Sequence, residues 1–186
     1  GNKILAVSNS DLHIVNAQII DAKGCYVVPG GVDLHVHGGG GRDFMEGTEE
    51  AFRVAIKAHM KHGTTSIFPT LSSSTVPMIE AACETCQTLM EEENSPVLGL
   101  HLEGPYFNPK QAGAQIPEWI KPPLAEEYEP LLDKYPCIKR WDEAPELPGS
   151  VEFIQSCRKH GLVASIGHTR ATDAAVVDGH KAGMMP

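Results

Sequence analysis

Three short segments of this chain carry histidine or glutamate side chains at positions that could bind a metal ion. In the first segment, His35 and His37 stand two positions apart in an apolar stretch that predicts a β-strand. Because side chains alternate along a strand, both imidazoles are expected on one face, together with Asp33. Two imidazoles placed in this way can bind one cation, since histidine nitrogen is a ligand of Zn and Fe. The first segment therefore predicts part of a metal site.

The other two segments each end a predicted strand. Glu103 is followed by a Gly-Pro pair that stops the strand, and His168 ends an apolar run before Thr169 and Thr172, either of which can cap a helix. Glu103 and His168 are therefore predicted as metal ligands, with a surface-turn carboxylate and a core histidine as the ordinary alternatives. His101 is expected to orient a ligand rather than to bind metal. The remaining histidines lie away from strand ends and are read as ordinary: His13, His59, His62, His160 and His180.

Strands alternate with helices along the chain. The expected strands are 3–8, 12–20, 25–28, 32–36, 64–71, 97–102, 138–141 and 162–166. The expected helices are 49–62, 76–90, 126–134, 150–160 and 171–182, with a long loop at 104–123. This alternation predicts an α/β fold with a parallel sheet. Polar residues, Glu143 among them, fall at the carboxyl ends of several strands, which favours a (β/α)₈ TIM barrel over an open doubly wound sheet.

Composition excludes several classes of partner. The 186 residues include 15 Lys and Arg against 24 Asp and Glu, so the net charge is −9, and no basic stripe predicts binding to nucleic acid. No apolar run reaches the ~18 residues of a membrane helix, so no membrane partner is expected. The five scattered cysteines indicate reduced thiols in a cytoplasmic protein. The Cys83–Cys86 pair is read as structural, and the glycines at 38–41 as a tight turn rather than a phosphate loop.

Four segments carry a resemblance to a known family. They are PGGVDLHVHGGGG at 29–41, HLEGPYFNPKQAGAQIPE at 101–118, APELPG at 144–149 and GHTRAT at 167–172. Together they resemble the N-acetylglucosamine-6-phosphate deacetylases of the amidohydrolase superfamily. The resemblance implies a TIM barrel of the metal-dependent hydrolase type, of which the chain holds the first five βα units. Residues 1–29 are then expected to form part of a small β-sandwich domain, and residues 30–186 part of the barrel.

The same resemblance implies an activity and a set of site residues. Members of the family remove acetate from N-acetylglucosamine 6-phosphate, in amino-sugar catabolism, with one or two divalent ions such as Zn or Fe(II). Glu103 and His168 match metal ligands, and His35 with His37 matches the pair that holds a second ion in some members. The main chain of Ala114 matches a substrate contact. Gln115 stands where the family often has a histidine that touches the substrate carbonyl.

Some functional parts are expected outside this stretch of sequence. The resemblance implies a catalytic general base and a further metal-binding histidine beyond Pro186, so no catalytic base is assigned within the chain. It also implies a homodimer in which the neighbouring subunit completes the phosphate site. Two alternatives remain open: another metal-dependent amidohydrolase of the dihydroorotase or hydantoinase type, which would need a bridging lysine where Glu103 stands, and an inactive metal-binding fragment.

Overall fold

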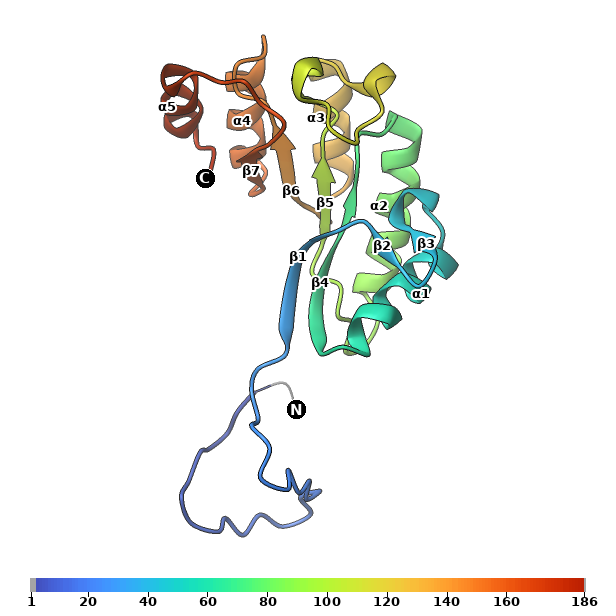
Figure 1. The fold of residues 1–186 in the computed structure, drawn as a ribbon, viewed down its shortest axis with the longest axis vertical. Coiled ribbons are helices and arrows are strands. Elements are labelled where there is room, and N and C mark those ends of the chain that lie inside the picture. The colour runs from blue at the N-terminus through green and yellow to red at the C-terminus, as the bar shows by residue number, and fades with distance from the viewer. Residues whose placement is uncertain (1–2, 186) are drawn as a thin grey trace.

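The computed structural model describes residues 3–185 (Figure 1). Five parallel strands form one sheet in the spatial order β1-β4-β5-β6-β7. Their bounds are β1 (Gly31–Val36), β4 (Thr64–Leu71), β5 (Leu100–Glu103), β6 (Ile138–Glu143) and β7 (Val163–Ile166). The helices that follow them are α1 (Glu49–Met60), α2 (Val76–Met90), α3 (Ala125–Lys134), α4 (Ser150–Lys159) and α5 (Asp173–Ala182).

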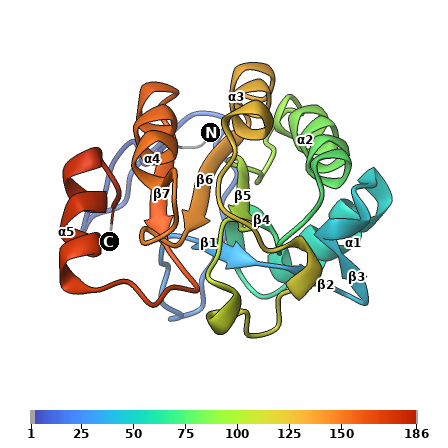
Figure 2. The ribbon, with the colours of Figure 1, turned by 90° about the horizontal axis from the view of Figure 1, so that it is seen from above.

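The sheet is curved, and its helices lie on one side of it. Seen from above, α1 to α5 follow one another around the outside of the arc that the strands form (Figure 2). A doubly wound sheet carries helices on both faces, whereas a (β/α) barrel carries them only outside. The arrangement therefore agrees with part of a barrel, as the strand-end polar residues predict. None of the helices in residues 3–185 combines the length and apolar character that a membrane span requires.

The core between strands and helices also holds the end of β5 in place. Trp141 of β6 is fully buried, stacks on Tyr106 with ring centroids 5.4 Å apart, and meets Phe153 of α4 edge to face. Its indole N–H donates to the carbonyl oxygen of Gly104, 2.9 Å away. A buried indole N–H needs such a partner. Aromatic packing thus fixes the backbone directly after Glu103.

The glycine run after β1 forms a tight hairpin. Strand β2 (Gly38–Gly39) pairs antiparallel with β3 (Arg42–Asp43), and the turn residues Gly40 and Gly41 both have positive φ. A short 3₁₀ turn, η1 (Phe44–Glu46), follows, capped by the side chain of Asp43. The predicted tight turn is confirmed.

The predicted strands at 3–8, 12–20 and 25–28 are wrong. Residues 3–30 contain no strand in the structure and form a wide loop below the start of β1 (Figure 1). A strand needs a neighbouring strand to accept and donate its backbone hydrogen bonds. The only backbone hydrogen bonds found in this segment close two local turns, and its apolar side chains stay exposed. The predicted β-sandwich of residues 1–29, whose first two residues lie outside the described part, stays a prediction.

Smaller differences concern where elements begin. β5 starts at Leu100 rather than 97, because Gly99 breaks the strand with a φ of 154°. Val97 forms only an isolated bridge to Ile67. α5 begins at Asp173 with Thr172 as its cap, which is one of the two caps the sequence offers. The loop predicted at 104–123 contains two short 3₁₀ turns, η2 (Pro109–Gln111) and η3 (Pro117–Trp119).

Candidate metal centre

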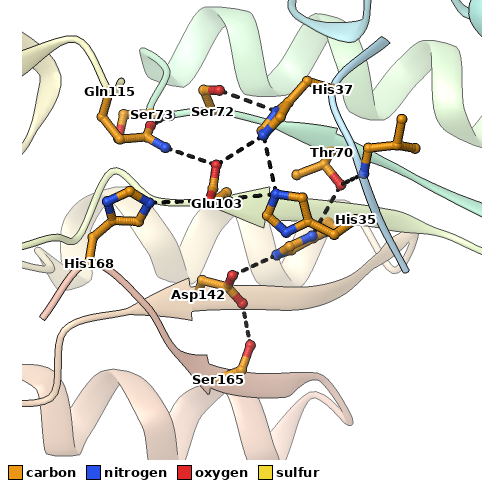
Figure 3. Close-up of polar contacts among 12 residues, drawn as sticks. His35, His37, Thr70, Ser72, Ser73, Glu103, Gln115, Asp142, Ser165 and His168 are labelled. Atoms are coloured by element: carbon orange, nitrogen blue, oxygen red, sulfur yellow. Dashed lines mark hydrogen bonds and ion pairs between the residues drawn. The ribbon is translucent and has the colours of Figure 1, made fainter. Parts of the chain in front are cut away.

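The four predicted ligands lie together at the carboxyl edge of the sheet (Figure 3). His35 belongs to β1, His37 follows that strand directly, Glu103 ends β5, and His168 comes two residues after β7. Nε2 of His37 lies 3.2 Å from Oε2 of Glu103, and Nε2 of His168 lies 3.2 Å from Oε1. Nε2 of His35 lies 3.6 Å from Oε1 and 3.2 Å from Nε2 of His37. Three imidazoles therefore surround one carboxylate.

The ring of His168 is held in one orientation. Its Nδ1 lies 2.8 Å from the carbonyl oxygen of Gln111. A carbonyl oxygen can only accept, so Nδ1 donates a proton to it and Nε2 is the nitrogen that faces Glu103. Phe107 packs against the imidazole with ring centroids 4.5 Å apart. Fixing a histidine through its other nitrogen is typical of metal ligands.

The charges at the site favour an ionised carboxylate. Burial alone would raise the pKa of Glu103, but hydrogen bonds from His37 and Gln115 and the nearby His35 lower that pKa to about 2. The hydrogen bond to Glu103 raises the pKa of His37. Burial lowers the pKa of His35, against the attraction of Glu103. The site thus keeps a negative carboxylate beside imidazoles, which is a ligand set that a divalent cation suits.

Gln115 is buried and engages both ends of its amide group. Its Nε2 donates to Oε2 of Glu103 at 2.8 Å, and its Oε1 accepts from the backbone N–H of Ser73 at 2.6 Å (Figure 3). The side chain therefore ties the end of β5 to the turn after β4. Ala114 beside it is exposed, and within residues 3–185 its backbone N–H and carbonyl make no hydrogen bond. Those backbone groups are free for a ligand.

Two overlapping groups of side chains in residues 3–185 have the spacing of a metal site. One consists of His35, His37 and Glu103, and the other of His35, His101 and Asp142. In each group the ligand atoms all lie within 4.8 Å of one another. The donor set of imidazole nitrogen and carboxylate oxygen is the one that catalytic Zn sites use. The residues present therefore fit the divalent ion that the sequence predicts.

Asp142 is a site residue that the sequence analysis missed. Its Oδ2 lies 3.1 Å from Nε2 of the fully buried His101, and its Oδ1 accepts from Nε of Arg140 at 2.9 Å and from the hydroxyl of Ser165. His101 reaches Thr70 Oγ1 with its other nitrogen, at 3.1 Å. Its ring lies edge-on to His35, with centroids 5.0 Å apart. The two adjacent carboxylates that end the strand, Asp142 and Glu143, were the available signal.

One sequence expectation about side-chain direction is wrong. Asp33 does not join the cluster: its carboxylate accepts from the backbone N–H of His35 and lies 3.9 Å from Nδ1 of His59. The register of β1 is irregular between Asp33 and Val36, which breaks the alternation. Glu143 lies at the carboxyl end of β6, as expected, and its side chain is fully buried beside Cys157. In β6 it is Asp142, one residue earlier, that reaches the cluster.

Comparison with known proteins agrees with this picture. A model of the amidohydrolase family matches residues 26–175. The chain is 34% identical to an N-acetylglucosamine-6-phosphate deacetylase of Bacillus subtilis over 163 residues, which is 84% of the chain and 41% of that protein. It is 32% identical to the human protein of the same name over 173 residues. The chain thus spans about 40% of the length of these curated relatives.

Solved structures of similar proteins have the same fold. The chain matches an N-acetylglucosamine-6-phosphate deacetylase from Pasteurella multocida with a TM-score of 0.86 and 28% identity, over 92% of the chain and 45% of that structure. A mutant deacetylase from Mycobacterium smegmatis, in complex with N-acetyl-D-glucosamine-6-phosphate, matches with a TM-score of 0.79 and 29% identity. That match covers 85% of this chain and 41% of the other.

Proposed function

The chain belongs to the amidohydrolase family, and on that basis we propose that the protein carrying it hydrolyses the acetamide of N-acetylglucosamine 6-phosphate to glucosamine 6-phosphate and acetate. The observation that carries this proposal is the ring of three imidazoles around Glu103 at the carboxyl edge of the sheet. Relatives that align with most of this chain bear the name of that deacetylase. Members of a TIM-barrel family carry their chemistry at this edge.

Four residues would hold a divalent metal: Glu103 and His168, with His35 and His37 available for a second ion. When bound there, a divalent ion supplies Lewis-acid polarisation of an amide carbonyl and lowers the pKa of water towards ~7. Zn and Fe(II) both suit histidine and carboxylate ligands. We propose one or two such ions, with Glu103 near both.

The other residues position the ligands and the substrate. The Gln111 carbonyl sets the tautomer of His168, and the amide of Gln115 orients Glu103. The backbone of Ala114, which is exposed in the same loop, would bind the substrate. Because the Gln115 amide cannot become cationic, any hydrogen bond that it gives the substrate is a neutral one.

Acetate release from N-acetylglucosamine 6-phosphate by the full-length protein tests this proposal. We expect turnover with Zn or Fe(II) that is lost in His168→Ala and retained in the matched variant His62→Ala, because His62 is exposed and its side chain makes no hydrogen bond or ion pair in residues 3–185. Unphosphorylated N-acetylglucosamine should be a poorer substrate. Hydrolysis of a cyclic amide such as dihydroorotate, with no acetate release, would instead support the alternative amidohydrolase.

A further inference from the structure

One carboxylate ties together three loops at the carboxyl edge of the sheet. Glu146 lies in the turn between β6 and α4, outside the ligand cluster. Its Oε1 accepts from Nδ2 of Asn108 at 2.8 Å and from the backbone N–H of Arg170 at 2.7 Å. Its Oε2 accepts from the hydroxyl of Thr169. Asn108 belongs to the loop after β5, and the other two residues belong to the loop after β7.

These hydrogen bonds enclose His168. Thr169 and Arg170 follow it directly in the chain, and the backbone N–H of Asn108 donates to the carbonyl oxygen of His168 itself, 3.1 Å away. Every segment that Glu146 binds is therefore also in contact with the histidine or adjacent to it. None of the three bonds contributes to the ligand cluster directly.

The backbone of His168 needs support of this kind. Its φ is 43°, in the left-handed region that residues other than glycine rarely adopt. Such a conformation persists only where surrounding contacts determine it. The left-handed turn is what directs the side chain from the end of β7 toward Glu103 rather than along the strand. Loosening the loop would let His168 relax to an ordinary conformation and leave the site.

The same carboxylate aligns the groups that hold the imidazole ring. Phe107, which packs on the ring, and Gln111, whose carbonyl oxygen accepts from Nδ1, lie on either side of Asn108 in the loop after β5. Glu146 binds the Asn108 side chain and the segment after His168 at once. It therefore sets the position of the ring relative to the groups that orient it.

We propose that Glu146 is a positioning residue that fixes His168 for metal binding, an inference that rests on the proposed function. The hydrogen bonds of the carboxylate go to Asn108, Thr169 and Arg170 and not to any of the four predicted ligands. It acts through the loop after β7, which it holds against the loop after β5. Glu146 accepts three hydrogen bonds from these two loops, which are far apart in the chain, so this one residue aligns them.

Metal affinity of the full-length protein, measured by competition with a chelator, tests the proposal. We expect Glu146→Ala to bind Zn about 10- to 100-fold more weakly, the range typical of residues that support metal ligands. Glu146→Gln keeps one oxygen that can accept from Asn108 and Arg170, so its loss should be about threefold, between wild type and Glu146→Ala. The matched control Glu152→Ala removes an exposed carboxylate of α4 that makes no hydrogen bond or ion pair in residues 3–185, and should bind Zn like wild type.

A second comparison separates positioning from general destabilisation. In a His168→Ala background, Glu146→Ala should cause no further loss of Zn affinity, because its effect passes through the missing imidazole. An equal loss in both backgrounds, or a lowered Tm with unchanged affinity, would overturn the proposal. If the wild-type protein binds Zn but releases no acetate, the proposed function fails while the affinity comparison still decides the role of Glu146. If the wild-type protein binds no divalent ion, both fail.

Discussion

At the scale of single residues, Gln115 has the clearest consequence for activity. The resemblance implies a substrate contact for this position, whereas in the structure the amide donates to Glu103 and accepts from the backbone of Ser73. The side chain therefore orients a candidate ligand. Whether it also meets the substrate stays a prediction.

We expect Gln115→Ala to lower kcat/KM by about 5- to 150-fold, equivalent to ~1–3 kcal/mol, less than the loss of a dedicated oxyanion donor. The reason is that Glu103 loses a buried hydrogen bond, together with any neutral donor that this amide gives the substrate. Steady-state kinetics, with elemental analysis of the same samples, should show a larger change in kcat/KM than in metal content. A kcat/KM within about twofold of that of the wild-type protein would argue against any role for Gln115 in the site.

Glu143 is a buried carboxyl that the proposed chemistry does not use. It is fully buried at the end of β6, and neither of its oxygens has a hydrogen-bond partner in residues 3–185. The neighbouring hydroxyl of Ser150 donates to the carbonyl oxygen of Ala144 instead. Burial raises the pKa of Glu143 to about 8, so the folded protein holds this carboxyl protonated at neutral pH.

This shift predicts a pH-dependent stability. The unfolded carboxyl ionises near pH ~4.3, so between that pH and about 8 the folded state binds the extra proton and stability falls as pH rises. From pH 5 to pH 8 the loss is at most ~4 kcal/mol. Glu143→Gln removes the ionisable carboxyl group and should lessen the decline in the free energy of unfolding. Urea denaturation at pH 5 and pH 8 would measure this. Equal declines in wild type and Glu143→Gln would show that Glu143 is ionised in the folded protein; Glu152→Gln is the exposed control.

At the scale of elements, the β2–β3 hairpin positions His37. It begins at the residue after His37, and a Cβ on Gly38 would overlap the carbonyl oxygen of Arg42 and lie 2.9 Å from Cα of Asp43. No side chain fits there without opening the hairpin. The glycine is thus required by the close approach of the two short strands.

Gly38→Ala should therefore displace His37 and weaken metal binding by tenfold or more, on the scale seen when support for a ligand is lost. Isothermal titration of the metal-free full-length protein with Zn would measure this. Gly31→Ala is the matched control, since a Cβ there would make only ordinary contacts, the nearest at 3.6 Å from the carbonyl oxygen of Gly63. Unchanged affinity in Gly38→Ala would mean that the hairpin does not control His37.

At the scale of the whole molecule, the sheet of residues 3–185 has β1 and β7 at its two edges. Val32, Leu34 and Val163 on these edge strands are partly exposed, as are many apolar side chains of residues 3–30. Exposed edges and apolar surface favour association. The exposed edges do not test the predicted homodimer or the predicted cytoplasmic location, and both stay predictions.

We expect residues 1–186, expressed by themselves, to self-associate and to show little turnover even with Zn or Fe(II) supplied. The resemblance implies that a general base and another metal-binding histidine lie outside them, and loss of a general base alone costs ~10²–10⁴ in rate. Light scattering and an acetate assay, with the full-length protein as reference, would check both expectations. Monodisperse protein with turnover near that of the reference would contradict them.

The amino-acid sequence by itself determined the candidate ligands and the elements that carry them. Strand periodicity and a Gly-Pro stop were enough to predict His35, His37, Glu103 and His168 at strand ends. Helix periodicity located α1 to α5 within a few residues of their observed bounds. Both signals are local, since they depend on neighbours within one or two turns or on alternate residues of one strand.

Only the tertiary structure decided which side chains meet. Asp142 rather than Glu143 faces His101, because the pairing of β6 with its neighbours sets which face of the strand points inward. Gln115 reaches Ser73, and Glu146 reaches Asn108 and Thr169, across long sequence separations that no local pattern records. Residues 3–30 contain apolar runs typical of strands yet form no strand, because a strand's backbone hydrogen bonds come from a neighbour in space and not from its own sequence.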